Sequence, residues 1–364
     1  MRNFKDLKRL VIKIGTNLLA KDHSIDIQYI ESISSQVSEV RNRGVQVLLV
    51  SSGAIGMGAS HLGLHSGVTD IKMRQACAAI GQPLLMHRYS EAFGRYSIPI
   101  AQVLLTREVL NNRKSFLNLK NSIETLLSLG VIPIINENDS VSTAEIGNAF
   151  GDNDTLSALV ASKADAGLLV ILTDIDGLYN GDPRKDPSAR LIKTVEEVTE
   201  ETFSFAGSAG STFSTGGMRT KLNAAVIAGT AGCRTIIAHG KKENIIGRIL
   251  DGEEEGTIFL PGERISARAR WILNSTPKGT INVDKGAVEA LRSRKSLLPS
   301  GIVSVEGVFD SGDVVSINGI AHAVSGFTST EIENLVGKHS KEIERILGSG
   351  RRDVVARPED IVFL

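Results

Sequence analysis

The chain has 364 residues, and about 150 residues per domain gives two or three domains. Hydrophobic residues make up 41% and charged residues 23%, which excludes a disordered, collagen-like or coiled-coil protein. The 41 basic and 41 acidic residues cancel, so no global charge favours a nucleic-acid-binding or membrane-surface protein.

The first nine residues are charged and lead directly into an apolar run, unlike a signal peptide. Nowhere is an apolar run long enough to span a bilayer, so we expect no membrane partner. Cys77 and Cys233 have neither zinc-site nor redox-motif spacing, so we expect buried thiols in a reducing compartment. A cytoplasmic location is therefore predicted.

Six short apolar runs alternate with helical patterns over roughly the first 260 residues. The runs are continuously apolar, which is typical of strands covered on both faces. Apolar residues spaced three and four apart predict helices over 27–40 and 116–127, ended by Gly44 and Gly130. The alternation predicts a doubly wound, mostly parallel α/β sandwich. The predicted strands are 10–14, 45–50, 98–105, 131–135, 168–172 and 235–238.

The composition changes after about residue 262. Short β-rich runs separated by glycine follow, and they predict a second, small, mostly β domain. The runs cover 280–283, 301–308, 313–317, 320–324 and the tail 353–364. We predict a first domain over 1–262, a linker over 263–277 and a small domain over 278–364.

Polar and glycine-rich segments follow four of the predicted strands. Ligands of doubly wound sheets bind beyond the carboxyl ends of the strands, so these segments are the candidate site. They are Gly15-Thr16-Asn17, Ser51-Ser52-Gly53, Asn136-Glu137-Asn138-Asp139 and Thr173-Asp174.

Lys13 lies inside an apolar strand, directly before Gly15. One interpretation is an edge strand from which the lysine extends its amine to solvent. The other is a cation at a strand end that reaches a phosphate, with Gly15 allowing close approach of the backbone. Lys13 alone leaves both open.

The segment 51–58 is rich in small residues that can form an anion cradle ahead of a helix. His61 replaces the third glycine of a dinucleotide fingerprint, and no acidic residue follows at the ribose-binding distance, so we exclude a nicotinamide site. A plain tight turn remains open. Zinc binding by His61 and His65 is disfavoured, as is hydrolase chemistry, because no nucleophile elbow surrounds Ser52.

Two acid–amide clusters, 136–139 and 151–154, flank one loop. Such clusters hold an amino group, a magnesium-bound phosphate or water on a polar turn, and two around the same loop favour a ligand. The segment 215–221 places glycines, a hydroxyl and a lysine before a helix predicted over 222–231. That is phosphate-cradle chemistry, although the lysine is not placed as in a Walker A loop.

Five segments occur in the order seen in the amino-acid kinase family: 11–16, 50–55, 135–139, 151–154 and 215–221. The chain resembles the members that act on glutamate, and its tail is similar to a PUA domain. The resemblance implies ATP-dependent phosphorylation of the γ-carboxylate of L-glutamate to L-glutamyl 5-phosphate, the first step of proline synthesis. It also implies inhibition by proline, a homo-oligomer, and a glutamyl phosphate reductase that uses the product.

The resemblance also assigns residue roles. Lys13 and Lys221 would neutralise phosphate charge, and Asp154 would hold both lysines. Magnesium would be held mainly through ATP phosphates, so no metal ligand from the protein is expected. The loop 140–150 departs from the family pattern. Glutamate-binding residues would be Ser52, Gly53, Asp139, Asp152 and Asn153. Nucleotide-binding residues would be Lys13, Thr173, Asp174, Thr215, Gly216, Gly217, Met218, Arg219, Thr220 and Lys221.

Two alternatives remain. The first is another amino-acid kinase, acting on aspartate, acetylglutamate, carbamate or a nucleoside monophosphate. The second is an RNA-associated protein, because PUA domains occur in such proteins. Residues 278–364 contain 11 basic and 12 acidic residues, a net charge of −1, which disfavours RNA binding. A local basic patch stays open: Arg292, Arg294, Lys295, Arg351 and Arg352.

Overall fold

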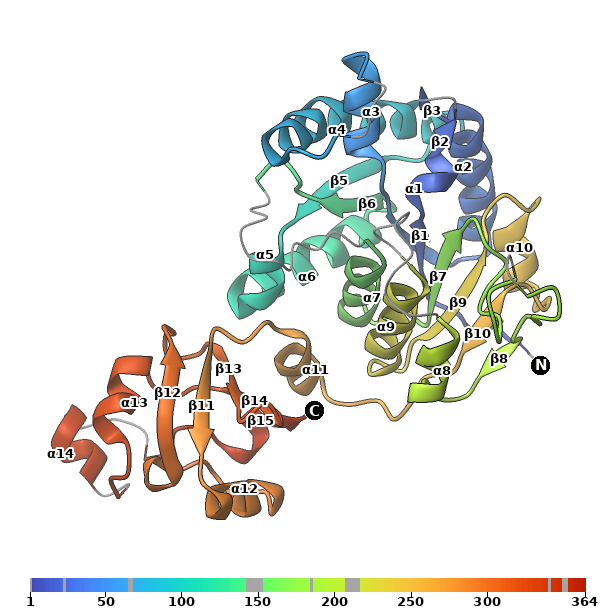
Figure 1. Cartoon of the computed structure of the whole chain (residues 1–364). Helices are drawn as coiled ribbons and strands as arrows, with labels where there is room; N and C mark the ends of the chain where they lie inside the picture. The colour runs from blue at the N-terminus through green and yellow to red at the C-terminus, as the bar shows by residue number, and fades with distance from the viewer. Residues whose placement is uncertain are drawn as a thin grey trace. The chain divides into compact units, whose positions relative to one another are not determined.

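The structure is a computed structural model that describes residues 2–21, 24–64, 68–141, 153–183, 186–206, 217–339, 342–348 and 353–364. The chain divides into two compact units (Figure 1). The first contains Met1–Val109 and Lys114–Arg264, and the second contains Leu110–Arg113 and Ile265–Leu364.

The first unit is built on an eight-stranded sheet in the order β5-β6-β4-β1-β7-β9-β10-β8. All neighbours pair in parallel except β9 and β10, which confirms the predicted mostly parallel sheet. The strands are β1 (Arg9–Ile14), β4 (Gln46–Val50), β5 (Ile100–Leu105), β6 (Ile132–Glu137), β7 (Leu168–Thr173), β8 (Thr194–Val195), β9 (Arg234–His239) and β10 (Thr257–Phe259). A small hairpin, β2 (Ala20–Lys21) and β3 (Ser24–Ile25), stands apart.

Helices cover this sheet on both sides, as a doubly wound fold requires (Figure 1). They are α1 (Thr16–Leu19), α2 (Ile27–Asn42), α3 (Ala54–His61), α4 (Ile71–Gly94), α5 (Arg107–Asn111), α6 (Arg113–Ser128), α7 (Asn153–Lys163), α8 (Glu200–Phe205), α9 (Met218–Gly229) and α10 (Ile245–Leu250).

The two helices predicted from apolar spacing form as expected. The carboxylate of Asp26 accepts a hydrogen bond from the Tyr29 amide at 3.0 Å and caps α2. Gly44 and Gly130 end the two helices with φ of +80° and +72°, the left-handed conformation favoured by glycine.

Lys13 lies on a central strand, because β1 pairs with β4 on one side and β7 on the other. The edge-strand interpretation is therefore wrong. The continuous apolar run of β1 has no solvent-facing side, and every residue from Leu10 to Ile14 is buried, including Lys13. A buried lysine needs a counter-charge, which points to the site described below.

The second unit has a five-stranded sheet in the order β12-β11-β13-β14-β15. Its strands lie close to the predicted runs: β11 (Gly279–Val283), β12 (Ile302–Gly307), β13 (Val314–Ile317), β14 (Ala321–Val324) and β15 (Ile361–Phe363). The sequence did not predict the α-helices found in the described residues of this unit, which are α11 (Ala267–Asn274), α12 (Lys285–Arg292), α13 (Ser329–Leu335) and α14 (Ile343–Leu347). Helix α11 falls within the predicted linker and packs Trp271 and Ile272 against Val314 and Val324. None of the helices in the described ranges is both long and apolar enough to cross a bilayer.

Candidate active site

The carboxyl ends of β1, β4, β6 and β7 lie at one edge of the parallel sheet. Lys13, Ser52, Asn136 and Thr173 lie at these ends, and all four are buried. The fold therefore brings together the four polar segments that the sequence predicted as the site.

Three charged side chains from distant parts of the chain form the centre of this edge. Lys13 Nζ is 2.7 Å from Asp154 Oδ1, and Lys221 Nζ is 3.0 Å from Asp154 Oδ2. Thr220 Oγ1 donates to the same Oδ2 at 2.9 Å. Asp154 is fully buried, and the two lysine side chains are only 8% and 6% exposed. The two ammonium groups and the one carboxylate together carry a net charge of +1, and the Asp174 carboxylate also interacts electrostatically with Lys221.

The cluster also sets the ionisation of Asp154. Burial alone would raise the pKa of this carboxyl, but the two neighbouring ammonium groups outweigh burial and lower its pKa to about 2. Asp154 is therefore ionised at neutral pH and acts as a fixed anion between the lysines.

Gly15 keeps the space beside the Lys13 amine open. A Cβ at position 15 would lie 3.1 Å from the Leu172 carbonyl oxygen and 4.0 Å from Lys13 Nζ. The Gly15 amide also donates to that carbonyl at 3.0 Å. Any larger residue would press on the Leu172 carbonyl of β7 and would contact the amine.

The loop after β4 leads directly into α3, so it is more than an isolated tight turn. Gly53 has φ +91° and forms the N-cap of α3, a left-handed conformation that a side chain would strain. Asn153 Nδ2 donates to the Ser51 carbonyl and to Ser52 Oγ, both at 2.8 Å. These bonds join the β4 loop to the first residue of α7.

Thr173 and Asp174 form a second polar group at the end of β7. Asn17 Nδ2 donates to Asp174 Oδ2 at 2.9 Å, and Thr173 Oγ1 donates to Oδ1 at 3.1 Å. Burial raises the pKa of Asp174, but the hydrogen bonds from Asn17 and Thr173 outweigh it and leave the pKa below its ordinary value.

Helix α9 begins at Met218, earlier than the sequence predicted, so Gly217 is its N-cap. Met218, Arg219, Thr220 and Lys221 form its first turn. The Thr220 amide donates to the Gly217 carbonyl at 3.2 Å, whereas the Met218 and Arg219 amides have no acceptor within the helix and point to an anion position. Arg219 stacks over the Phe203 ring at 5.3 Å.

Asp139 follows β6 and is half-buried. Burial raises the pKa of its carboxyl, and the nearby Arg74 guanidinium opposes this rise without cancelling it. Several predictions concern residues outside the described ranges. They are Asp152, Thr215, Gly216, most of the loop 140–150, His65, and Arg351 and Arg352 of the basic patch.

The sequence analysis missed two side chains that support the site. Gln82 Oε1 accepts from Asn136 Nδ2 at 2.8 Å, and Tyr89 OH lies 3.0 Å from Ser51 Oγ. Both come from α4, which contains none of the five family segments, so no local signal could identify them.

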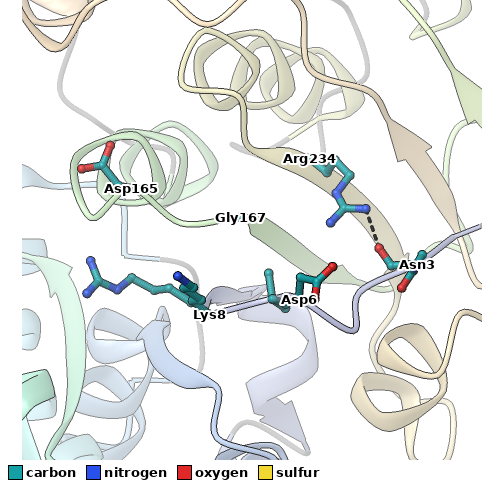
Figure 2. Close-up of a pocket in the computed structure, with 8 residues that line it drawn as sticks. Asn3, Asp6, Lys8, Asp165, Gly167 and Arg234 are labelled. Atoms are coloured by element: carbon teal, nitrogen blue, oxygen red, sulfur yellow. Dashed lines mark hydrogen bonds between the residues drawn. The ribbon is translucent and has the colours of Figure 1, made fainter.

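A separate hollow of about 330 Å³ lies at the opposite, amino-terminal ends of β1, β7 and β9 (Figure 2). Three of its charged side chains have partners. Arg234 donates to the Asn3 carbonyl at 2.7 Å, Arg9 pairs with Glu124 at 2.8 Å, and Asp165 pairs with Lys120 at 3.1 Å. The bond from Arg234 to Asn3 ties the amino-terminal segment to β9 beside this hollow.

Residues 8–239 match the model of the amino acid kinase family, and residues 279–347 match that of the PUA domain. The chain belongs to the amino acid kinase family. Its relatives include the glutamate 5-kinase of Methanosarcina barkeri, 48% identical over 98% of this chain and 96% of the relative. The glutamate 5-kinase of Geobacter sulfurreducens is 47% identical over 98% of each chain. Among solved structures, carbamate kinase from Giardia lamblia bound to AMP-PNP has the same fold, with a TM-score of 0.52 and 19% identity. The match covers 71% of this chain and 100% of that one.

Proposed function

We propose that this chain transfers the γ-phosphoryl group of ATP to the γ-carboxylate of L-glutamate, giving L-glutamyl 5-phosphate and ADP. The observation that carries the proposal is the pair of buried lysine amines held on one carboxylate at the sheet edge. Full-length similarity to glutamate 5-kinases supports glutamate as the acceptor.

The chemistry needs charge stabilisation more than a base. A carboxylate oxygen of the substrate attacks the γ-phosphorus, a P–O bond forms, and the bond to the ADP oxygen breaks. The attacking carboxylate is already ionised at neutral pH, so no proton has to be removed. The barrier falls through positioning and through stabilisation of charge on the phosphoryl oxygens, for which Lys13 and Lys221 are placed.

The residues present fit a polyphosphate. Lys13, Asp154 and Lys221 together carry a net charge of +1, and the Met218 and Arg219 amides at the N-terminus of α9 have no acceptor within that helix. We assign the phosphates to Lys13, Lys221 and the first turn of α9, and the rest of the nucleotide to the Thr173-Asp174 end of β7.

Within the described ranges, no cluster of three or more His, Cys, Asp or Glu side chains could hold a metal ion. Magnesium bound through the phosphate oxygens would lower their charge.

Glutamate is assigned to the β4 loop and the start of α7. Ser52, Gly53 and Asn153 form one wall, and Asp139 after β6 offers a carboxylate to the substrate amino group. Asp152 belongs to the same proposal by its position in the sequence.

Trapping with hydroxylamine tests this proposal, because hydroxylamine converts an acyl phosphate to a hydroxamate. We expect hydroxamate formation with ATP and L-glutamate and much less with aspartate, N-acetylglutamate or carbamate. Phosphorylation of a nucleoside monophosphate would be followed as ADP release. Preference for any acceptor over L-glutamate would contradict the proposal.

Inhibition by proline, assembly into a homo-oligomer and transfer of the labile product to a glutamyl phosphate reductase complete the proposal. The same assay repeated with added proline tests the first. Light scattering of the purified protein tests the second, and binding of a reductase by the full chain tests the third.

A further inference from the structure

The orientation of the buried Asn136 amide is fixed by the backbone. The Glu137 amide donates to Asn136 Oδ1 at 2.9 Å, and a backbone N–H can only donate. The other end of the side chain is therefore the NH₂ group. That group donates to Gln82 Oε1 at 2.8 Å.

The Asn153 amide is fixed by the same logic. Its NH₂ group donates to the Ser51 carbonyl oxygen, which can only accept, and to Ser52 Oγ, both at 2.8 Å, and it also lies 3.2 Å from Asn136 Oδ1. Asn153 Oδ1 must then point away from these acceptors. A side-chain oxygen at this position is suited to accept a hydrogen bond from an ammonium group.

Gln82 is held in place by unusually close helix packing. A Cβ on Gly81 would lie 1.9 Å from the Ala54 carbonyl oxygen, and a Cβ on Gly58 would lie 1.9 Å from the Cys77 carbonyl oxygen. The backbones of α3 and α4 therefore touch (Figure 1). Gln82 follows Gly81 directly in α4 and lies 2.8 Å from Asn136 at the end of β6.

The orientation of Gln82 comes at an energetic cost. Its Nε2 is buried and has no hydrogen-bond partner in the described part of the chain, which is unfavourable. A flipped amide would place two NH₂ groups face to face, so Asn136 dictates the orientation observed. Gln82 is only 7% exposed, which removes solvent as a substitute acceptor for Asn136.

We propose that Gln82 is a positioning residue for substrate specificity: it anchors the NH₂ end of Asn136, which acts together with Ser51 and Ser52 to orient the Asn153 oxygen toward the α-ammonium group of the amino-acid substrate. This inference rests on the proposed function. Gln82 does not touch the reacting atoms, so its loss affects recognition of the amino group and leaves the phosphoryl transfer step intact.

The test compares L-glutamate with glutarate, which has the same two carboxylates and no amino group. In Gln82→Met, Asn136 loses its acceptor. We expect the KM for L-glutamate to rise about tenfold, the size of losing one hydrogen bond to a charged group. The Ki of glutarate, the KM for ATP and kcat should stay within about twofold of the wild-type values, since none depends on the amino group.

Gln36→Met is the matched control. Gln36 is equally buried, in α2, and its Oε1 accepts from the Ile246 amide at 3.0 Å. We expect it to lower thermal stability without changing either glutamate or glutarate binding. Gln82→Glu keeps an acceptor oxygen for Asn136 whether or not it is protonated. It should hold the KM for L-glutamate within about threefold of wild type, and it serves as the test if Gln82→Met does not fold.

The outcomes separate the two proposals. A wild-type protein that makes no hydroxamate from L-glutamate overturns the proposed function and this inference with it. An active wild type overturns the inference alone if Gln82→Met changes the glutamate and glutarate constants equally, or changes neither. The inference is also overturned if folded Gln82→Glu has a tenfold higher KM for L-glutamate. It is overturned as well if Gln36→Met raises the KM for L-glutamate.

Discussion

Lys13 and Lys221 are more than 200 positions apart in sequence, yet their amines share one carboxylate. Replacing either lysine by alanine removes a preorganised cation from the transferring phosphoryl group. We expect kcat to fall by roughly 10²–10³ in each variant. Steady-state kinetics at saturating ATP and L-glutamate measure kcat.

Lys120→Ala, which breaks only an exposed pair with Asp165, is the control and should keep wild-type turnover. Near-normal kcat in both Lys13→Ala and Lys221→Ala would remove them from the mechanism.

Asp154 compensates two buried cations, so its charge matters for folding as well as for catalysis. Asp154→Asn leaves both ammonium groups buried without their counter-charge. We expect the free energy of unfolding to fall by about 3–5 kcal/mol. Asp165→Asn, whose carboxylate is 38% exposed, should change it by under about 1 kcal/mol. Urea unfolding measures both, and equal effects of the two substitutions would contradict this account.

The same carboxylate predicts how stability responds to acid. Its pKa in the folded protein is about 2, below the ordinary value of 3.8, so the unfolded chain binds the proton more readily. The stabilisation is complete above about pH 4 and is lost as the pH falls towards 2. Urea unfolding from pH 5 to pH 2 should therefore show a smaller pH-dependent loss in Asp154→Asn than in the wild type. If the free energy of unfolding falls equally with pH in the wild type and in Asp154→Asn, this account of Asp154 is contradicted.

At the scale of elements, the sequence predicts best what depends on local pattern. Six of the eight strands of the large sheet were predicted to within two residues at each end, because continuous apolar runs bounded by polar residues mark a buried strand. The sequence missed β8 and β10, which have only two and three residues and form no such run. The polar ends of β1, β4, β6 and β7 followed from the same pattern. Gln82 was missed because its role depends on packing against α3 and on an asparagine 54 positions away. The short helices of the second unit were hidden between glycine-separated β runs.

The contact between α3 and α4 gives a prediction with an internal control. A Cβ at Gly58 would overlap the α4 backbone, whereas a Cβ at Gly56 meets nothing within 4 Å. Both glycines lie in α3. Gly58→Ala should cost about 1–3 kcal/mol through overpacking. Gly56→Ala should stabilise by about 0.5–1 kcal/mol through helix propensity. Thermal unfolding distinguishes the two variants. Similar shifts of the melting temperature in the same direction would show that the close contact between the α3 and α4 backbones does not require glycine at position 58.

At the scale of the whole molecule, the division of the chain can be tested directly. The sequence predicted a linker over 263–277 and a small domain from 278, and those limits remain a prediction. The second unit has its own core, including Ile281, Phe309 and Phe327. That core is extended by α11, because Trp271 and Ile272 pack against Val314 and Val324.

Two fragments of the second unit decide where the folded domain begins. A fragment over 265–364 retains α11, whereas one over 278–364 exposes the apolar surface that Trp271 covers. Loss of a buried tryptophan costs about 3–5 kcal/mol, so we expect the longer fragment to unfold cooperatively at a clearly higher temperature. Trp271→Ala in the longer fragment should reproduce most of the loss and controls for chain length. If both fragments melt at the same temperature, α11 is a connecting segment and the folded domain begins at residue 278, as the sequence alone predicts.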